Sequence, residues 1–195
     1  MPLAHSFAPV ADKNAKVLIL GSMPGEMSLS AGEYYATPRN VFWRILAELF
    51  RFDAASPYEL RICALKSVRI ALWDVLHSCA REGSSDAEID NDSLTANDFK
   101  SFLRGHPKIQ HVFFNGAKAE ACYRRHVLPQ LHCNSVIYLR LPSTSPANAS
   151  MSYKRKLKAW RVITAQPQLA AARNRRSLFK VDHCPAPDFI ALILG

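Results

Sequence analysis

The chain has 195 residues, of which 49% are hydrophobic, and a formal net charge of +9. This length suits one globular domain with its own core, and the hydrophobic content excludes a largely disordered chain. The positive charge favours an anionic partner, nucleic acid first, although a basic protein without such a partner has the same composition.

Short apolar runs alternate with helical patterns along the chain. The run "KVLIL", closed by Gly21, predicts a buried parallel strand, and "TPRNVFWRILAELF" predicts a helix capped by Thr37. A helix in "PYELRICALKSV" and a strand in "RIALWDVL" follow, then a polar loop-like segment. A helix is expected in "ANDFKSFLRGHP", with Asn97 or Thr95 near its cap. The remaining expected elements are a strand in "IQHVFFNG", a helix in "AKAEACYRRHVLPQL", a strand in "NSVIYLRLPS" and a helix in "YKRKLKAWRVITAQ".

This order predicts an α/β fold: a three-layer α/β/α sandwich with a central, mainly four-stranded parallel sheet. We expect residues 1–166 to form the domain and residues 167–195, with "ARNRR" and "FIALILG", to form a C-terminal extension to which the sequence assigns no role. Neither a leader-like apolar run nor a membrane span is present, so the expectation is a cytoplasmic, monomeric protein. The cysteine spacing fits no metal site, and no cofactor is expected.

Ligands of parallel α/β sheets bind beyond the carboxyl ends of the strands, where the connecting loops converge. The loop after the first expected strand is "GSMPG", here named the first loop, and its glycines and proline favour a tight turn with exposed backbone N–H groups. An ordinary turn explains the same residues, and their spacing is not that of a dinucleotide or phosphate loop. The candidate base-binding residues are Gly21, Ser22, Met23, Pro24 and Gly25.

Aromatic and amide side chains follow the first loop. Tyr34 and Tyr35 stand in a polar segment, and Asn40 falls in the expected first turn of the next helix. An asparagine amide can hold a water molecule or contact a base edge, whereas the plainer interpretation is that Asn40 caps its helix and Tyr35 packs on the core. Asp74 ends the second expected strand and is the second catalytic candidate, although a loop hydrogen bond explains it equally well.

The segment "LPSTSPANAS", residues 141–150, is here named the second loop. Its hydroxyl groups and prolines make a stiff, donor-rich turn suited to phosphate contacts, and a basic helix is expected directly after it. A solvated turn and a solvated helix face are the competing interpretations. The candidate DNA-binding residues are Pro142, Ser143, Thr144, Ser145, Lys154, Arg155 and Lys158.

Three motifs in this order resemble the uracil-DNA glycosylase superfamily over residues 16–163. "GSMPG" resembles its first motif, "LPSTSPANA" its second, and "PRNVFW" a segment of its mismatch-specific branch. Two positions depart from the common pattern: Met23 stands where many branches carry a water-positioning Asn or Asp, and Leu141 stands where many carry His or Asn. The combination with the tyrosine pair is most similar to the hypoxanthine-DNA glycosylase branch, also called DNA-deoxyinosine glycosylase, which is understood to move the key asparagine to the position of Asn40.

The resemblance implies a monofunctional glycosylase that flips a deaminated base out of DNA and hydrolyses its N-glycosidic bond in base excision repair. Hypoxanthine is the implied base, with uracil as a further candidate. Tyr35 would stack on the base, Asn40 would serve the chemistry, and the partner is DNA containing a deaminated base. The alternatives are a mismatch-specific uracil/thymine glycosylase and a non-catalytic nucleic-acid-binding relative, which the methionine at position 23 would suit.

Overall fold

The computed structural model describes residues 2–131 and 136–165, so the extension expected at 167–195 lies outside the described residues. A four-stranded parallel sheet has the order β3 (Ile70–Asp74), β2 (Val17–Gly21), β6 (His111–Asn115), β7 (Ile137–Leu141). The expected strand "KVLIL" is therefore internal, and the predicted parallel sheet is confirmed.

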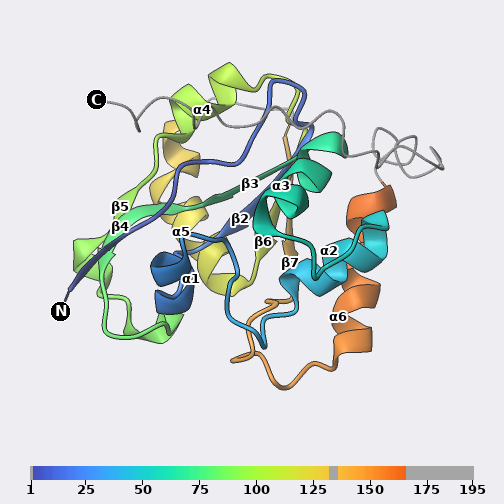
Figure 1. The fold of residues 1–195 in the computed structure, drawn as a ribbon. Helices are drawn as coiled ribbons and strands as arrows, with labels where there is room; N and C mark the ends of the chain where they lie inside the picture. The colour runs from blue at the N-terminus through green and yellow to red at the C-terminus, as the bar shows by residue number, and fades with distance from the viewer. Residues whose placement is uncertain (1, 132–135, 166–195) are drawn as a thin grey trace, which may run out of the picture.

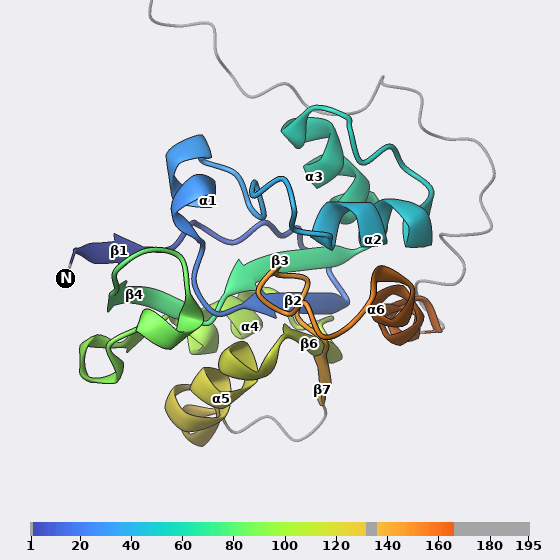
Figure 2. The same cartoon turned by 90° about the horizontal axis from the view of Figure 1, so that it is seen from below.

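Helices cover both faces of this sheet (Figures 1 and 2). Side chains alternate along β2, so that Val17 and Ile19 enter one core cluster and Leu18 and Leu20 the other. The first cluster includes residues of α2 (Phe42–Phe50), α3 (Tyr58–Ser67) and α6 (Tyr153–Trp160). The second includes residues of α4 (Phe99–Gly105) and α5 (Ala117–His126). The three-layer α/β/α sandwich is confirmed.

A second, antiparallel sheet was not predicted. It has the order β1 (Leu3–His5), β4 (Leu76–Ala80), β5 (Thr95–Ala96). Only Val75 separates β3 from β4. Val75 and Leu76 donate backbone hydrogen bonds to the carbonyls of Gly21 and Ser22. The apolar run "RIALWDVL" hides this break, since it continues across both strands.

Two expected helix starts are wrong. Residues 37–40 form a turn in which the Asn40 N–H donates to the Thr37 carbonyl over 2.8 Å, and α2 begins only at Phe42. The cap of α4 is Asp98, whose carboxylate accepts from the Ser101 N–H, whereas Asn97 donates to the carbonyls of Asp74 and Leu76. The polar segment before β5 contains two short 3-10 helices, η1 (Asp86–Glu88) and η2 (Asn91–Ser93). The remaining described elements are α1 (Glu26–Ala31), η3 (Leu128–Gln130) and η4 (Arg161–Ala165).

Candidate functional site

Four residues end the parallel strands at one edge of the sheet. Gly21 pairs with Asp74 across β2 and β3, and Asn115 pairs with Leu141 across β6 and β7. This carboxyl edge is where ligands bind in such sheets. The first loop, the segment with the tyrosine pair and the second loop all leave from or return to this edge, as the sequence predicts.

The first loop is held rigidly from beneath. The Ser22 hydroxyl donates to Asp86 over 2.6 Å, and the guanidinium of the buried Arg81 donates to the Pro24 carbonyl over 2.6 Å. The Met23 side chain is 7% exposed and belongs to the core, so it takes no part in holding water. Pro24 has no N–H, whereas those of Met23 and Gly25 have no hydrogen-bond partner among the described residues and remain available to a ligand.

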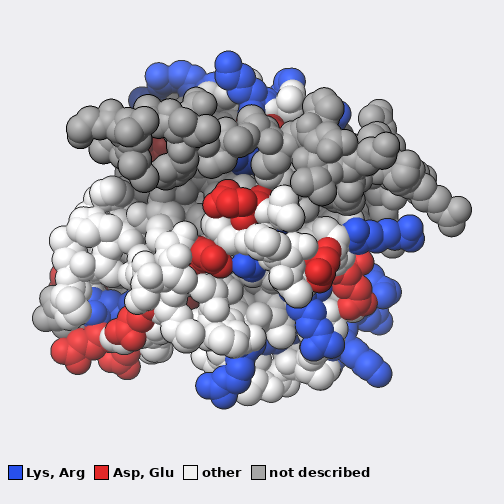
Figure 3. All heavy atoms as spheres, in the orientation of Figure 1, with Lys and Arg blue, Asp and Glu red and all other residues white. Residues whose placement is uncertain are grey.

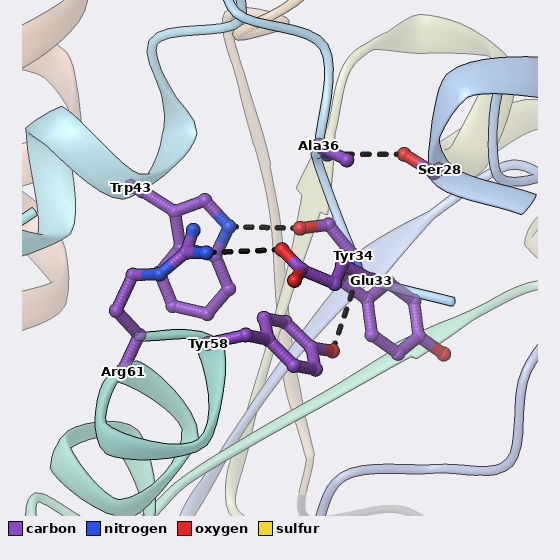
Figure 4. Close-up of polar contacts among 7 residues, drawn as sticks. All are labelled: Ser28, Glu33, Tyr34, Ala36, Trp43, Tyr58 and Arg61. Carbon is purple, nitrogen blue, oxygen red and sulfur yellow. Dashed lines mark hydrogen bonds and ion pairs between the residues drawn. The ribbon is translucent and has the colours of Figure 1, made fainter. Parts of the chain in front are cut away.

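The tyrosine loop, residues 33–36, is clamped by three helices (Figure 4). The Ala36 N–H donates to the Ser28 hydroxyl of α1, the Trp43 indole N–H of α2 donates to the Tyr34 carbonyl over 2.8 Å, and the Tyr34 N–H donates to the Tyr58 hydroxyl of α3. An ion pair of 3.0 Å between Arg61 and Glu33 adds a fourth attachment. These contacts hold the loop in one conformation.

Tyr35 lies in the left-handed region of backbone conformation, with φ at 56°, which a tyrosine seldom adopts. Its ring stacks on Phe42 with 3.9 Å between the centroids, so one face of the ring is already covered. The buried hydroxyl lies beside Gly21 and makes no hydrogen bond of good geometry; burial raises the pKa of this phenol, the Asp74 charge adds to the effect, and an interaction with the Asn115 side chain opposes it. Both interpretations of Tyr35 therefore describe part of it, since one face packs on the core and the hydroxyl faces the carboxyl edge.

Asn40 lies just before α2 rather than in its first turn. Its side-chain oxygen accepts from the Phe42 N–H over 3.0 Å, so it helps to start the helix. The amide NH₂ group has no partner among the described residues, and the side chain is half-buried. The neighbouring Val41 N–H donates to the Thr144 carbonyl over 3.2 Å, which fixes this segment against the second loop.

The second loop is anchored by Asn115, the last residue of β6. The Asn115 side chain donates to the Thr144 hydroxyl and accepts from the Thr144 N–H, both over 2.9 Å, and Thr144 is fully buried. The Trp160 indole N–H of α6 donates to the Pro142 carbonyl, and the Lys156 ammonium contacts the Ser145 carbonyl. The second loop is thus bonded to β6 and to α6, and Ser143 within it is half-buried.

The basic helix α6 follows the second loop and divides its charges between two sides. Lys156 is buried, and burial lowers the pKa of its ammonium group. Lys154, Arg155 and Lys158 are exposed. Figure 3 shows Lys and Arg side chains protruding along the margin where α6 lies, with some acidic side chains beside them, and a group of Asp and Glu side chains on the side of η1 and η2.

Asp74 is the most enclosed acid of this edge. It is 2% exposed, one of its oxygens lies against Gly21, and the other is buried without a hydrogen-bond partner. A side chain at position 21 would collide with that first oxygen and would come within 3.1 Å of the Tyr35 hydroxyl, so only glycine fits there. The sequence singles out Asp74, but it gives no signal for Arg81 and Asp86, which come from a segment without apolar periodicity.

A family model described as the uracil DNA glycosylase superfamily matches residues 8–164. The chain belongs to the uracil DNA glycosylase superfamily. The resemblance to this superfamily, which the motifs predict, is confirmed.

The relatives of this superfamily member include two proteins named hypoxanthine DNA glycosylase. The one from Methanosarcina barkeri (strain Fusaro / DSM 804) is 40% identical over 116 residues, 59% of this chain and 72% of the relative. The one from Methanosarcina acetivorans is 36% identical over 155 residues, 79% of this chain and 94% of the relative. The solution structure of a presumed uracil DNA glycosylase from Methanosarcina acetivorans superposes with a TM-score of 0.69 at 33% identity, covering 88% of this chain and 98% of that one.

Two classes of additional site find no support in the part of the chain that the structure describes. Residues 2–131 and 136–165 contain no group of three or more His, Cys, Asp or Glu side chains placed to hold a metal ion. No helix within the same ranges has the length and apolarity to cross a bilayer.

A cleft of about 460 Å³ is lined by β5, α4 and the end of α5, and it contains none of the residues predicted for the site.

Proposed function

We propose that this protein is a monofunctional DNA glycosylase that removes hypoxanthine from deaminated DNA, with uracil as a second candidate substrate. One observation carries the proposal: an asparagine amide with a free NH₂ group lies beside the second loop, while the methionine of the first loop is in the core. The two relatives named hypoxanthine DNA glycosylase support the choice of base.

The target base must leave the duplex before the enzyme can reach its glycosidic bond. Unstacking costs a few kcal/mol, and stacking on an aromatic side chain returns about 1–3 kcal/mol per base. Phe42 covers one face of the Tyr35 ring, so only the opposite face is left for the flipped base. The rigid tyrosine loop holds that ring at the carboxyl edge before DNA arrives, which limits the entropy lost on binding.

Bond cleavage produces positive charge on the sugar and negative charge on the base. Asn40 orients the water that attacks C1′ of the sugar, and the free N–H groups of Met23 and Gly25 are donors available to the base. Neither step uses a metal or an organic cofactor. Because Gly21 has no side chain, the Asp74 carboxyl group and the Tyr35 hydroxyl can lie close to the start of the first loop.

The second loop and α6 supply the DNA contacts in this proposal. Ser143, Ser145 and Pro142 contact the phosphate backbone, Thr144 supports them from within, and the exposed cations of α6 neutralise neighbouring phosphates. All these parts come from one chain, which supports a monomer as the active unit. The cytoplasmic location stays a prediction.

A panel of oligonucleotides tests the proposal directly. Each carries hypoxanthine, uracil or xanthine, in single-stranded form or opposite each normal base, and one further duplex carries thymine opposite guanine. The expected result is alkali-dependent strand cleavage at hypoxanthine by the full chain. Binding without cleavage of any substrate in the panel would show a non-catalytic relative, and cleavage confined to mismatched uracil and thymine would show the mismatch-specific activity.

A further inference from the structure

Asp74 carries a feature that water orientation by Asn40 does not explain. Its carboxyl group is enclosed at the carboxyl edge, and one oxygen lacks any hydrogen-bond partner although it is buried. Leaving a buried polar atom unpaired costs about 1–3 kcal/mol, and more for a charged group. Such a cost is understandable where a ligand completes the pairing, and the neighbouring Tyr35 hydroxyl is unpaired in the same way.

No cation of the described residues forms an ion pair with this carboxyl group. Arg81 donates from one terminal nitrogen to the Pro24 carbonyl, whereas its Nε and its other terminal nitrogen are buried without a hydrogen-bond partner. The other polar groups that face Asp74 are the hydroxyls of Tyr34 and Tyr35 and the carboxylate of Asp86 on η1. Two carboxyl groups that share the electrostatic influence of one guanidinium favour a proton on the more buried acid.

Electrostatics agree with this geometry. Burial is the main cause that raises the pKa of Asp74, and the Asp86 charge adds to it, whereas a hydrogen bond from Tyr34 and the positive charge of Arg81 oppose it; together they leave the pKa at about 8. At neutral pH most molecules therefore hold Asp74 as the uncharged carboxylic acid, which can donate a proton.

We propose that Asp74 is the general acid that protonates the N7 atom of the leaving purine, an inference that rests on the glycosidic activity proposed above. The C1′–N9 bond breaks and its electron pair goes to the purine, which takes the Asp74 proton at N7 and leaves as neutral hypoxanthine. Water adds to C1′ and loses one proton to solvent. A proton from solvent then restores the acid, so that the sum is one water consumed for one base released.

This assignment makes Asp74 a specificity group as well. A purine has an imidazole nitrogen in the plane of the ring, whereas uracil has no N7 and leaves as an anion stabilised by hydrogen bonds alone. General acid catalysis contributes typically 10²–10⁴-fold to a rate. An acid placed for N7 therefore accelerates the loss of hypoxanthine and does little for uracil.

Single-turnover excision from duplex DNA tests the role of Asp74, with hypoxanthine and uracil substrates between pH 6 and pH 9.5. For hypoxanthine, the wild-type rate should fall as pH rises through about 8, because only the protonated acid is active. Asp74→Asn keeps the shape of the side chain but has no acidic proton, so its rate should be at least about 10²-fold lower and independent of pH over this range. With uracil, Asp74→Asn should change the rate less than about threefold.

Asp86→Asn provides a second variant with a different signature. It removes a negative charge that holds the proton on Asp74, so the falling limb of the hypoxanthine profile should move to lower pH without disappearing. A wild-type rate that stays level or rises through pH 8, or equal losses on hypoxanthine and uracil in Asp74→Asn, would overturn the role of Asp74. A wild-type protein that excises neither base would instead overturn the proposed function itself.

Discussion

Asn40 uses only half of its side-chain amide inside the protein. The oxygen accepts from the Phe42 N–H at the start of α2, and the NH₂ group is free. Asn40→Ala should therefore reduce single-turnover excision of hypoxanthine by roughly 10²–10³-fold, the usual cost of one lost transition-state contact. DNA affinity should stay nearly unchanged, and the lost helix-start bond should cost about 1 kcal/mol of unfolding free energy.

Asn14→Ala is the matched control, because Asn14 is an exposed asparagine that accepts a hydrogen bond from Lys108. It should leave excision at the wild-type rate. Near wild-type excision by Asn40→Ala would contradict the catalytic role. An equal loss of excision and DNA binding would show that Asn40 merely holds the start of α2.

The raised pKa of Asp74 leads to a prediction of how the stability of the protein depends on pH. Its folded pKa, about 8, lies above the ordinary value of an aspartate, so between these values the folded state holds a proton that the unfolded chain has released. This contribution to stability is complete below the ordinary pKa and is lost as pH rises through about 8. Asp74→Asn removes the effect, so its unfolding free energy should exceed that of the wild type by a margin that grows from pH 5 to pH 8.

The margin should grow by at most about 1.4 kcal/mol per pH unit, and urea unfolding of both proteins at each pH measures it. Glu82→Gln, an exposed carboxyl-to-amide change, is the control and should show a constant difference from the wild type. A constant difference for Asp74→Asn as well would mean that this carboxyl group is ionised in the folded protein at neutral pH.

The sequence identifies the residues that carry distinctive chemistry but not the residues that hold them. Asn40 stands out because it comes directly before the apolar run of a helix, and Asp74 stands out because it ends an apolar run. Asn115 ends β6 as Asp74 ends β3, yet its two bonds to Thr144 depend on a residue 29 positions away. Pairings over such distances leave no local pattern, and the same is true of Arg81 beneath Pro24.

At the scale of elements, the bonds between Asn115 and Thr144 join β6 to the second loop, and the Val41 N–H joins that loop to the Asn40 segment. Asn115→Ala leaves the buried Thr144 N–H and hydroxyl unpaired, so it should lower the unfolding free energy by about 1–3 kcal/mol. It should also weaken DNA binding, because the loop loses its preorganisation. Urea unfolding and fluorescence anisotropy with labelled duplex DNA measure the two effects.

Thr144→Ser keeps both hydrogen bonds to Asn115 and serves as the conservative counterpart. It should retain wild-type DNA affinity, with a stability loss limited to one buried methyl group. If Asn115→Ala binds DNA as tightly as the wild type, the second loop does not depend on β6 for its binding conformation.

The elements themselves divide into those that periodicity reveals and those that it does not. The strands β2, β3 and β6 are apolar runs buried along most of their length, which is why the sequence predicts them, whereas β7 at the sheet edge is largely exposed. The sequence predicts the start of α2 too early, because Thr37 and Pro38 are residue types that favour a helix start. In the structure these residues belong to a turn that ends at Asn40. The sequence does not predict the small antiparallel sheet, because β5 has only two residues and β4 continues the apolar run of β3.

On the scale of the whole molecule, the fold distributes the charges behind the net charge of +9 unevenly over the surface. The exposed cations of α6 adjoin the second loop at the carboxyl edge, whereas the acidic segment of η1 and η2 lies on the other side of the site (Figure 3). This polarity favours an approach of DNA from the α6 side, since the phosphate backbone is attracted there and repelled from the acidic segment.

The combined substitution Lys154→Ala and Lys158→Ala tests this polarity. A protein that neutralises Z phosphates has a binding constant that falls with salt with a logarithmic slope of about −0.9Z, so the loss of two contacts should flatten the slope by about 1.8. Lys13→Ala with Lys108→Ala changes the charge equally at exposed positions outside the predicted DNA contacts, and it should leave the slope close to that of the wild type. Anisotropy titrations with non-specific duplex DNA between about 50 and 200 mM salt supply the comparison. Equal flattening in the two double variants would show that net charge alone attracts DNA, and an unchanged slope after the α6 substitutions would show that this helix only faces solvent.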